Sequence, residues 1–419
     1  MNKGILVATT ALAFMGFLGA ARAADCGIIV GVVMEMTGPA GNYGQAGSKS
    51  VEMAFRDLND AGGPGGCTLS ADIRDSQSQA SVAVDAATQL VGVKKVPLLI
   101  GGIISSTSIP ILTSVTGPAK VVQISPAASS PTLTSLGKSG KTNGVFFRTI
   151  QSDALQGLAE AKFAMDHGYK RLSVIYVNGD FGVNLLNEFS KAYKALGGEL
   201  VSVTPYNEKQ STYQAEVTAG MKGNPDALFL ISTPVDGATI ARTWISQGGV
   251  QKFLLNDGME SPDFVESVGA QYLNDTFGTS SGTIATASTD YFLKNYKAFS
   301  GLEPSSPPAN RAYDAAAIAG LALAIAGPSD PEALRKAVSQ VVDPKGTPIF
   351  AGKDEFVKAL ALIKDHKPIK YEGVVGPLSF DEYGDVTGPF QLWKFTDGKQ
   401  TTVGEMTKEQ VDQLKAQLH

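Results

Sequence analysis

Short apolar runs alternate with longer amphipathic segments along most of the chain. Runs such as Gly27–Met34 and Leu172–Val177 have the length and the valine and isoleucine content of buried strands. Segments such as Gly44–Ala61 and Asn184–Leu196 carry apolar residues at helical spacing instead. Because strands that alternate with helices pair in parallel, the pattern predicts βαβ units and an α/β fold.

The alternation divides into two series that meet near Ile150. The first is predicted to contain strands at Gly27–Met34, Thr68–Asp75, Pro97–Ile100, Ala119–Ile124 and Val145–Phe147, and helices at Gly44–Ala61, Ser78–Lys94 and Ser106–Ser114. The second is predicted to contain strands at Leu172–Val177, Leu200–Tyr206, Ala227–Ile231 and Lys252–Leu255, and helices at Asp153–His167, Asn184–Leu196, Ser211–Met221 and Asp236–Ser246. Since both series repeat one order of elements, we expect two similar lobes, each a doubly wound parallel sheet.

From Ser288 onward the pattern becomes mostly helical. Helices are predicted at Ser288–Phe299, Pro308–Ala326, Pro331–Val341 and Lys353–Lys364, and two short strands, Gly376–Phe380 and Phe390–Phe395, are predicted to close the chain. This block has no complete sheet of its own, so we expect it to pack on one of the two lobes. The stretches Gly301–Pro308 and Asp343–Gly352 are rich in glycine and proline and are predicted to be surface connections.

The first 23 residues have the features of a secretory signal peptide. Lys3 precedes an apolar run from Gly4 to Ala21, and Ala21-Arg22-Ala23 supplies the small residues of a cleavage site. We expect cleavage after Ala23 or Ala24 and export of the mature chain to the periplasm. An uncleaved membrane anchor is the alternative, which the glycines late in the run and the cleavage pattern disfavour.

Composition narrows the classes of partner. The 35 basic and 40 acidic residues give a formal net charge of −5, which argues against a nucleic-acid partner. The chain has only three histidines and two cysteines, too few for a multi-ligand Cys/His metal site. We therefore expect neither a metal nor any other cofactor.

The two cysteines, Cys26 and Cys67, each precede one of the first two predicted strands. If these strands are parallel neighbours, both cysteines lie at the same end and within bridging reach. An exported protein can keep such a disulfide in an oxidising compartment. Lipidation of Cys26 is the alternative, but Asp25 stands where a lipidation signal needs a small residue.

Hydroxyl residues follow two neighbouring strands of the first series. Ser105 and Ser106 come after the strand that ends near Ile100, and Ser129 comes after the strand that ends near Ile124. Hydroxyls and free N–H groups at a helix start can bind an anion, although each loop alone could equally be a plain helix cap. Two such loops at adjacent strand ends converge on the ligand crevice of an open α/β sheet.

Catalytic constellations are missing from the sequence. It contains no G-x-S-x-G elbow, no H-E-x-x-H pair and no Cys-x-x-Cys motif. We therefore expect a binding protein and not an enzyme.

A series of short motifs resembles one known family. In order, the motifs are Thr37-Gly-Pro39 with Tyr43-Gly44, Leu58-Asn59 with Gly62-Gly63, Gly101-Gly102 with Ser105-Ser106, Ser125-Pro-Ala-Ala128, Phe147-Arg-Thr149, Asp180-Phe-Gly182 and the segment Gly376–Asp385. Their order and spacing resemble the periplasmic solute-binding proteins of branched-chain amino acid ABC transporters, of the leucine-binding type. The resemblance covers essentially the whole mature chain.

This resemblance implies a type I fold, in which two Rossmann-like lobes are joined by three crossing segments and close on a small ligand. The crossings are expected near Arg148, Thr279 and Phe390. The N-terminal lobe would then hold residues 24–148 and 280–389. The C-terminal lobe would hold residues 149–279 and 390–419.

The resemblance also implies the ligand contacts. The α-carboxylate of an amino acid is expected at Ser105 and Ser129, and the α-ammonium at the Ala127 carbonyl and at Asp257. The remaining expected ligand-binding residues are Tyr43, Ser106, Ala128, Phe181 and Thr233, of which Phe181 and Thr233 replace tyrosines of relatives. For Asp257 a turn in Asn256-Asp-Gly258 is the alternative to a ligand contact.

The implied function is that of an extracytoplasmic receptor that captures an amino acid-like ligand and delivers it to a membrane permease of an ABC importer. Two alternatives stay open within this class, a receptor for an aromatic or other small carboxylate and a receptor for urea or a short amide. From another class, an extracellular hydrolase is the remote alternative. We expect the receptor to be a monomer.

Overall fold

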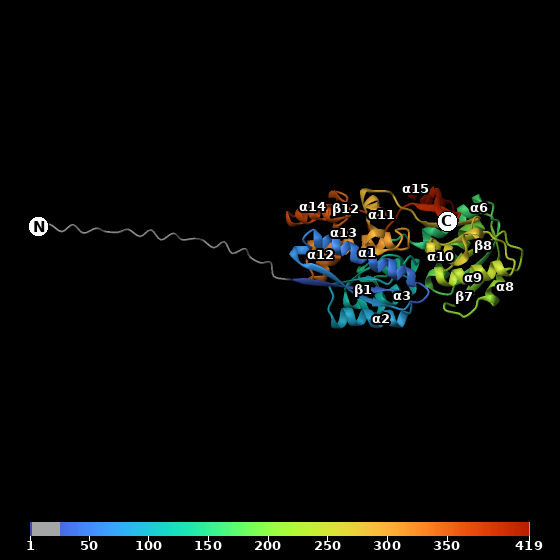
Figure 1. The fold of residues 1–419 in the computed structure, drawn as a ribbon, viewed down its shortest axis with the longest axis horizontal. Helices are drawn as coiled ribbons and strands as arrows, with labels where there is room; N and C mark the ends of the chain where they lie inside the picture. Colours follow the sequence, from blue (N-terminus) through green and yellow to red (C-terminus); the bar gives the residue numbers. More distant parts are fainter. Residues whose placement is uncertain (2–25, 419) are drawn as a thin grey trace.

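A computed structural model, which describes Met1 and residues 26–418, shows two lobes side by side along the long axis of the molecule (Figure 1). The predicted signal peptide falls almost entirely on residues outside the described part of the chain. In the described part, no helix combines the length and the apolar character needed to cross a membrane.

The first lobe contains a five-stranded parallel sheet in the order β2-β1-β3-β4-β5. Its strands are β1 (Gly27–Met34), β2 (Thr68–Asp75), β3 (Leu98–Gly101), β4 (Val122–Ser125) and β5 (Phe146–Arg148). The connecting helices are α1 (Gly41–Asp60), α2 (Ala80–Thr88), α3 (Ser105–Ile111), α4 (Gly117–Ala119) and α5 (Pro131–Lys138). Short π-helical segments, Gln89–Val93 and Leu112–Thr116, extend α2 and α3.

Both faces of this sheet are covered by helices, which explains why β1 is apolar at consecutive positions. Val32 belongs to the core beneath α1, whereas its neighbour Val33 belongs to the core beneath α2 and α3. The helical block that follows residue 286 packs on the α1 side and completes that core. The prediction that this block lacks its own sheet and joins a lobe is therefore confirmed.

The block consists of α11 (Ala287–Ser300), α12 (Ala309–Ala326), α13 (Pro331–Gln340) and α14 (Lys353–Lys364). A small sheet of β11 (Thr347–Ile349), β12 (Ile369–Gly373) and β13 (Gly376–Pro377) lies beside it. The stretch Asp343–Gly352, predicted to be a simple surface connection, thus contains a strand.

The second lobe contains a seven-stranded sheet in the order β15-β14-β10-β9-β8-β6-β7. Its strands are β6 (Arg171–Val177), β7 (Glu199–Tyr206), β8 (Ala227–Ile231), β9 (Phe253–Leu255), β10 (Thr276–Ser281), β14 (Phe390–Thr396) and β15 (Lys399–Met406). One face packs against α6 (Asp153–Asp166), α7 (Asp180–Ala195) and α15 (Lys408–Leu418), and the other against α8 (Gln214–Gly220), α9 (Pro234–Ser246) and α10 (Pro262–Val268). The chain passes between the lobes after β5, after β10 and before β14.

Four elements of the second lobe were not predicted, namely α10, β10, β15 and α15. The expectation that two short strands close the chain is wrong, because β15 and α15 follow β14. β15 is a sheet edge with mostly exposed polar residues, so it lacks the apolar run of a buried strand. β10 reads Thr-Phe-Gly-Thr-Ser-Ser, and its burial depends on neighbours that the local pattern does not reveal.

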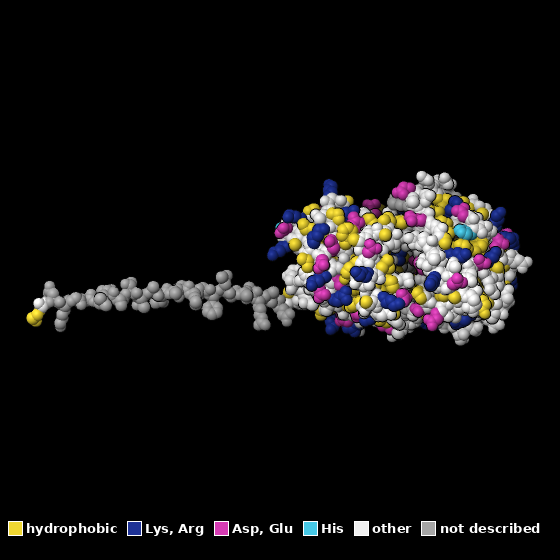
Figure 2. Space-filling model, turned by 45° about the horizontal axis from the view of Figure 1, so that its top comes forward, with side chains coloured by type: hydrophobic (Ala, Val, Ile, Leu, Met, Phe, Trp, Pro, Cys, Tyr) yellow, Lys and Arg dark blue, Asp and Glu magenta, His cyan; other side chains and the backbone are white. Residues whose placement is uncertain are grey.

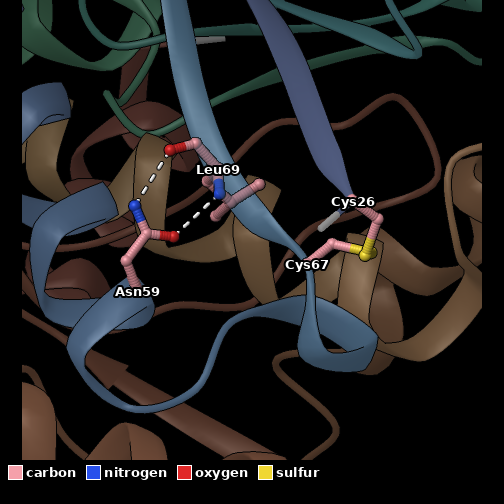
Figure 3. The surroundings of a disulfide bond; sticks show 4 residues. All are labelled: Cys26, Asn59, Cys67 and Leu69. Carbon is pink, nitrogen blue, oxygen red and sulfur yellow. Dashed lines mark hydrogen bonds between the residues drawn. A yellow bond between two sulfur atoms is a disulfide. The ribbon is translucent and has the colours of Figure 1, made fainter. Parts of the chain in front are cut away.

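Cys26 and Cys67 form a disulfide, as predicted (Figure 3). Gly27 lies opposite Thr68 in the parallel register of β1 and β2, which places the two preceding cysteines side by side. The same sheet edge is held from α1, because the Asn59 side chain donates to the Leu69 carbonyl at 2.9 Å and accepts from the Leu69 amide at 2.7 Å. The disulfide and the asparagine together fix β2 at the outer edge of the sheet.

Replacing both Cys26 and Cys67 by serine should lower the free energy of unfolding by about 4 kcal/mol. The physical reason is the loop-closure entropy of a bridge across a sequence separation of 41 residues. Denaturant unfolding of the mature protein measures the loss, and the oxidised parent should show no thiol that reacts without reductant. Two reactive thiols in the folded, oxidised parent would contradict this account.

Candidate ligand-binding cavity

A cavity lies between the two lobes, where Figure 2 shows the surface hollowed. Its empty volume is about 930 Å³, part of it open to solvent. The first lobe supplies residues that follow β3 and β4, and the second lobe supplies residues that follow β8, β9 and β10. This is the crevice at the carboxyl ends of parallel strands, where open α/β sheets bind ligands.

Seven of the nine residues predicted to bind ligand line this cavity. They are Tyr43, Ser105, Ala127, Ser129, Phe181, Thr233 and Asp257. Ser106 and Ala128 are not among the lining residues, although each is the neighbour of a residue that is. Ala128 is fully buried, and its carbonyl accepts a hydrogen bond from the Arg148 side chain.

Ser105 and Ser129 are brought together by the neighbouring positions of β3 and β4. The Ser105 Oγ accepts a hydrogen bond from the amide of Ser130 at 3.2 Å, which ties the loop after β4 to the start of α3. Ser105 and Ser129 are 1% and 3% exposed, so a ligand that reaches them leaves water. At the end of β3, Gly101 has φ +119°, and a Cβ there would lie 1.9 Å from the Val33 carbonyl oxygen.

Glu35 supports the Ser105 loop from beneath. Its carboxyl group is fully buried and accepts hydrogen bonds from the Ile103 amide at 3.1 Å and from the Thr107 hydroxyl. Burial raises the pKa of Glu35 to about 7, although these hydrogen bonds act in the opposite direction. The loop that presents Ser105 is thus fixed by a buried carboxyl that no sequence motif indicated.

Arg148 holds the loop that presents Ser129. Its buried guanidinium donates to Asp385 at 2.7 Å and to the carbonyls of Ala128 and Ser130 at 3.1 Å. It also donates to the Thr134 hydroxyl at 2.9 Å. The two carbonyls flank Ser129, so the arginine determines which way that residue faces.

The second lobe presents Thr233, Asn256 and Asp257 to the cavity. Thr233 precedes α9, and its buried hydroxyl has no hydrogen-bond partner among the described residues. Asp257 begins a short 3₁₀ turn and accepts a hydrogen bond from the amide of Gly258 at 2.9 Å. Asp257 therefore forms a turn and also lines the cavity. Burial raises the pKa of Asp257, and nearby Arg311 offsets part of this rise.

The two lobes are in contact across the cavity. The hydroxyl of Tyr43 on α1 approaches Gly258 so closely that a Cβ there would lie 2.0 Å from the oxygen. The Asn42 side chain donates to Asp263 at 2.7 Å, and the Thr132 hydroxyl donates to Asp180 at 3.1 Å. These contacts join the two lobes beside the cavity.

Sequence reasoning missed several cavity residues. Glu260, Ser280, Ser281 and Arg311 all line the cavity, and so does the segment 304–308. The prediction that Gly301–Pro308 is only a surface connection is therefore wrong for its second half. Arg311 lies in the alanine-rich α12, whose pattern indicates a buried helix and gives no signal of a polar site.

Among the residues that the structure describes, no group of histidine, cysteine or acidic side chains is arranged to hold a metal ion. The acidic cavity residues Asp257 and Glu260 instead share their surroundings with the Arg311 guanidinium. What the cavity offers is a set of hydroxyl, amide, carboxyl and guanidinium groups for a small polar molecule.

Residues 27–394 match the model of the periplasmic binding protein family. The chain belongs to this family. Its members are receptors that bind solutes outside the cytoplasm, so the coarse prediction of an extracytoplasmic binding protein is confirmed. The resemblance drawn from the short motifs is confirmed as well.

Three relatives illustrate the match. Leu/Ile/Val-binding protein homolog 3 of Brucella melitensis is 24% identical over 402 residues, which cover 95% of this chain and 99% of the relative. The substrate-binding protein LivJ of Streptococcus pneumoniae, solved with isoleucine, is 22% identical with a TM-score of 0.74, covering 91% of this chain and 99% of LivJ. A solute-binding protein of R. palustris, solved with 4-hydroxybenzoate, is 19% identical with a TM-score of 0.73, covering 91% of this chain and 96% of that protein. The predicted two-lobed type I fold is confirmed by these likenesses.

Proposed function

We propose that this periplasmic binding protein is the receptor of an ABC importer and captures an amino acid in the cavity between its lobes. The observation that carries the proposal is the placement of Ser105 and Ser129 on one lobe and Asp257 on the other, around one cavity. A zwitterion requires this separation of hydroxyl donors from a carboxylate acceptor. Burial of an unpaired charge costs roughly several kcal/mol of binding free energy, so each charged end of the ligand needs a partner.

The ligand's α-carboxylate would accept hydrogen bonds from the hydroxyls of Ser105 and Ser129. The starts of α3 and α5 follow these loops, and helix N-termini favour a negative charge. The α-ammonium would donate to Asp257 and to the carbonyl of Ala127, which also lines the cavity. Tyr43, Thr233 and Phe181 would enclose the rest of the molecule.

The proposed mechanism is capture without chemical change. A ligand that contacts both lobes favours the closed arrangement, because only that arrangement supplies both sets of contacts. The three segments that join the lobes would act as the hinge. No catalytic role is assigned to any residue.

The proposed setting is the periplasm. The family relationship supports a location outside the cytoplasm, and the signal-peptide pattern of the first 23 residues supports export. A monomeric receptor would deliver the ligand to its membrane permease.

A receptor for an aromatic carboxylate is the second candidate. It is favoured by the apolar lining from Phe181, Tyr43 and Ile150 and by the relative solved with 4-hydroxybenzoate. The acidic residues Asp257 and Glu260 argue for an amino acid instead, because a plain carboxylate would meet like charges there.

Thermal denaturation in the presence of single compounds tests the receptor proposal. The panel should contain the common amino acids, benzoate, 4-hydroxybenzoate, urea and acetamide. At least one amino acid should raise the melting temperature, since binding to the native state adds about 2.7 kcal/mol at a hundred-fold excess over Kd. A flat response across the whole panel would reject the receptor, and a response to aromatic acids alone would select the second candidate.

Asp257→Asn should weaken binding of the amino acid found in this way by at least about 2 kcal/mol, because a buried ammonium loses its charged partner. Ser129→Ala should weaken it by about 1.5 to 3 kcal/mol, the range for a hydrogen bond to a charged group. Calorimetric titration measures both losses. Asp275→Asn, an exposed substitution outside the cavity, is the matched control and should leave the affinity unchanged. Undiminished binding by Asp257→Asn would refute the role given to that residue.

A further inference from the structure

The cavity contains a second set of polar residues besides those proposed to bind the α-carboxylate and α-ammonium of the ligand. Glu260, Ser280, Ser281 and Arg311 line it, and none of them has a role in holding the α-carboxylate or the α-ammonium. Ser280 and Ser281 end β10, and Arg311 lies in the first turn of α12. Strand and helix thus come from different lobes and meet beside one part of the cavity.

Arg311 has unused hydrogen-bonding capacity. A guanidinium carries five N–H donors, and in Arg311 only Nη2 donates a hydrogen bond, to the Ser281 carbonyl at 2.7 Å. Among the described residues, Nε is buried without a partner and no carboxylate forms an ion pair with this side chain. With 8% of its surface exposed, the residue has lost most of its hydration. A buried N–H donor without a partner is costly, which indicates that another molecule completes the hydrogen bonding of this guanidinium.

Two hydroxyl groups that line the same cavity also lack hydrogen-bond partners among the described residues. The hydroxyl of Ser281, next to the carbonyl that Arg311 contacts, is buried without a partner among the described residues. The hydroxyl of Thr233, on the second lobe, is likewise unpartnered there. All three residues line the one cavity, so a single ligand can supply the missing contacts.

The charged groups around Arg311 determine which kind of ligand group can contact it. Arg311 interacts electrostatically with Asp257, Glu260 and Asp314, of which Asp257 and Glu260 line the cavity. Asp314 already accepts hydrogen bonds from the Tyr371 hydroxyl and from the amides of Val374 and Val375. If Asp257 pairs with the ligand's ammonium, Glu260 is therefore the cavity acid that remains beside Arg311. A group that faces both needs an acceptor for the guanidinium and a donor for the carboxyl. A neutral primary amide has both, whereas a carboxylate has no N–H or O–H to donate to Glu260 and an alkyl group would leave Arg311 unpartnered.

We propose that Arg311 is a specificity-determining residue that donates to the side-chain carbonyl of the ligand, and that the ligand is an amino acid whose side chain ends in an amide. In this arrangement Glu260 accepts from the amide nitrogen, and the hydroxyls of Ser280 and Ser281 lie beside the same group. The inference rests on the proposed function, because it places the backbone of the ligand at Ser105, Ser129 and Asp257.

Calorimetric titration with glutamine, asparagine, glutamate and norleucine tests the inference. The better of the two amides should bind to the parent at least about 10-fold more tightly than glutamate or norleucine, because a site that hydrogen-bonds a polar group rejects analogues without it. Arg311→Met should weaken binding of that amide at least about 30-fold and change norleucine binding less than about 3-fold. Glu260→Gln should shift the preference from the amide toward glutamate by at least about 10-fold, since the glutamine side chain supplies an N–H donor to the ligand's carboxylate.

Arg242→Met is the matched control. Arg242 also donates to a backbone carbonyl, that of Ser267 at 2.7 Å, but it lies outside the cavity and is exposed. This variant should keep the parent's order of preference. If circular dichroism shows that Arg311→Met does not fold, the same titrations with Arg311→Lys and Glu260→Gln replace it.

The outcomes separate this inference from the proposed function. Norleucine bound as tightly as the amides, or an amide preference that survives Arg311→Met and Arg311→Lys, would overturn the role of Arg311 and leave the amino acid receptor intact. Water filling the unpartnered positions would give this result. Failure of every amino acid to bind, with an aromatic acid bound instead, would overturn both proposals.

Discussion

The buried guanidinium of Arg148 holds together the edge of the first lobe that faces the cavity. It carries a full charge in a place without exposed surface, and removal of such a group from water is costly unless every donor is used. Asp385 supplies the opposite charge, and the carbonyls on both sides of Ser129 take further donors. Because Asp385 is far along the chain, this one side chain joins the last part of the first lobe to the loop that meets the ligand.

The neighbouring loop, which presents Ser105, is held by a buried carboxyl group instead of a buried guanidinium. Glu35, at the end of β1, accepts from the amide of Ile103 and the hydroxyl of Thr107 and so determines the path of the chain up to Ser105. Both loops are therefore held by hydrogen bonds within the first lobe itself, without any contribution from a ligand. Preorganised donors lose little entropy on binding, which leaves closure of the second lobe as the main conformational cost.

The sequence was sufficient to predict those parts of the molecule that depend on local pattern. Gly27–Met34 was found with its observed bounds because an apolar run marks a strand covered on both faces. Thr68–Asp75 was also found with its observed bounds, although this edge strand has a single buried residue. Ser105 and Ser129 were found because hydroxyls directly follow such runs, and the disulfide was found because both cysteines precede them. In each case the relevant neighbours are neighbours in a parallel sheet, so strand order alone brings them together.

Other residues could not be found in this way because their surroundings come from distant parts of the chain. Arg311 faces the cavity only because α12 packs beside α1 and begins at the same edge of the first lobe, a placement that an alanine-rich helical pattern does not encode. The segment 304–308 lines the cavity for the same reason. Polar residues in β10 became buried through pairing with β9 and β14, which no local propensity predicts.

A single ligand that contacts both lobes at once is the central requirement of the proposed function. A crystal structure of the protein with the amino acid that most raises its melting temperature tests this directly. We predict density for one molecule in the cavity, with its carboxylate within hydrogen-bond distance of Ser105 and Ser129 and its ammonium within that distance of Asp257. A ligand that contacts only one lobe, or that lies outside the cavity, would contradict the account.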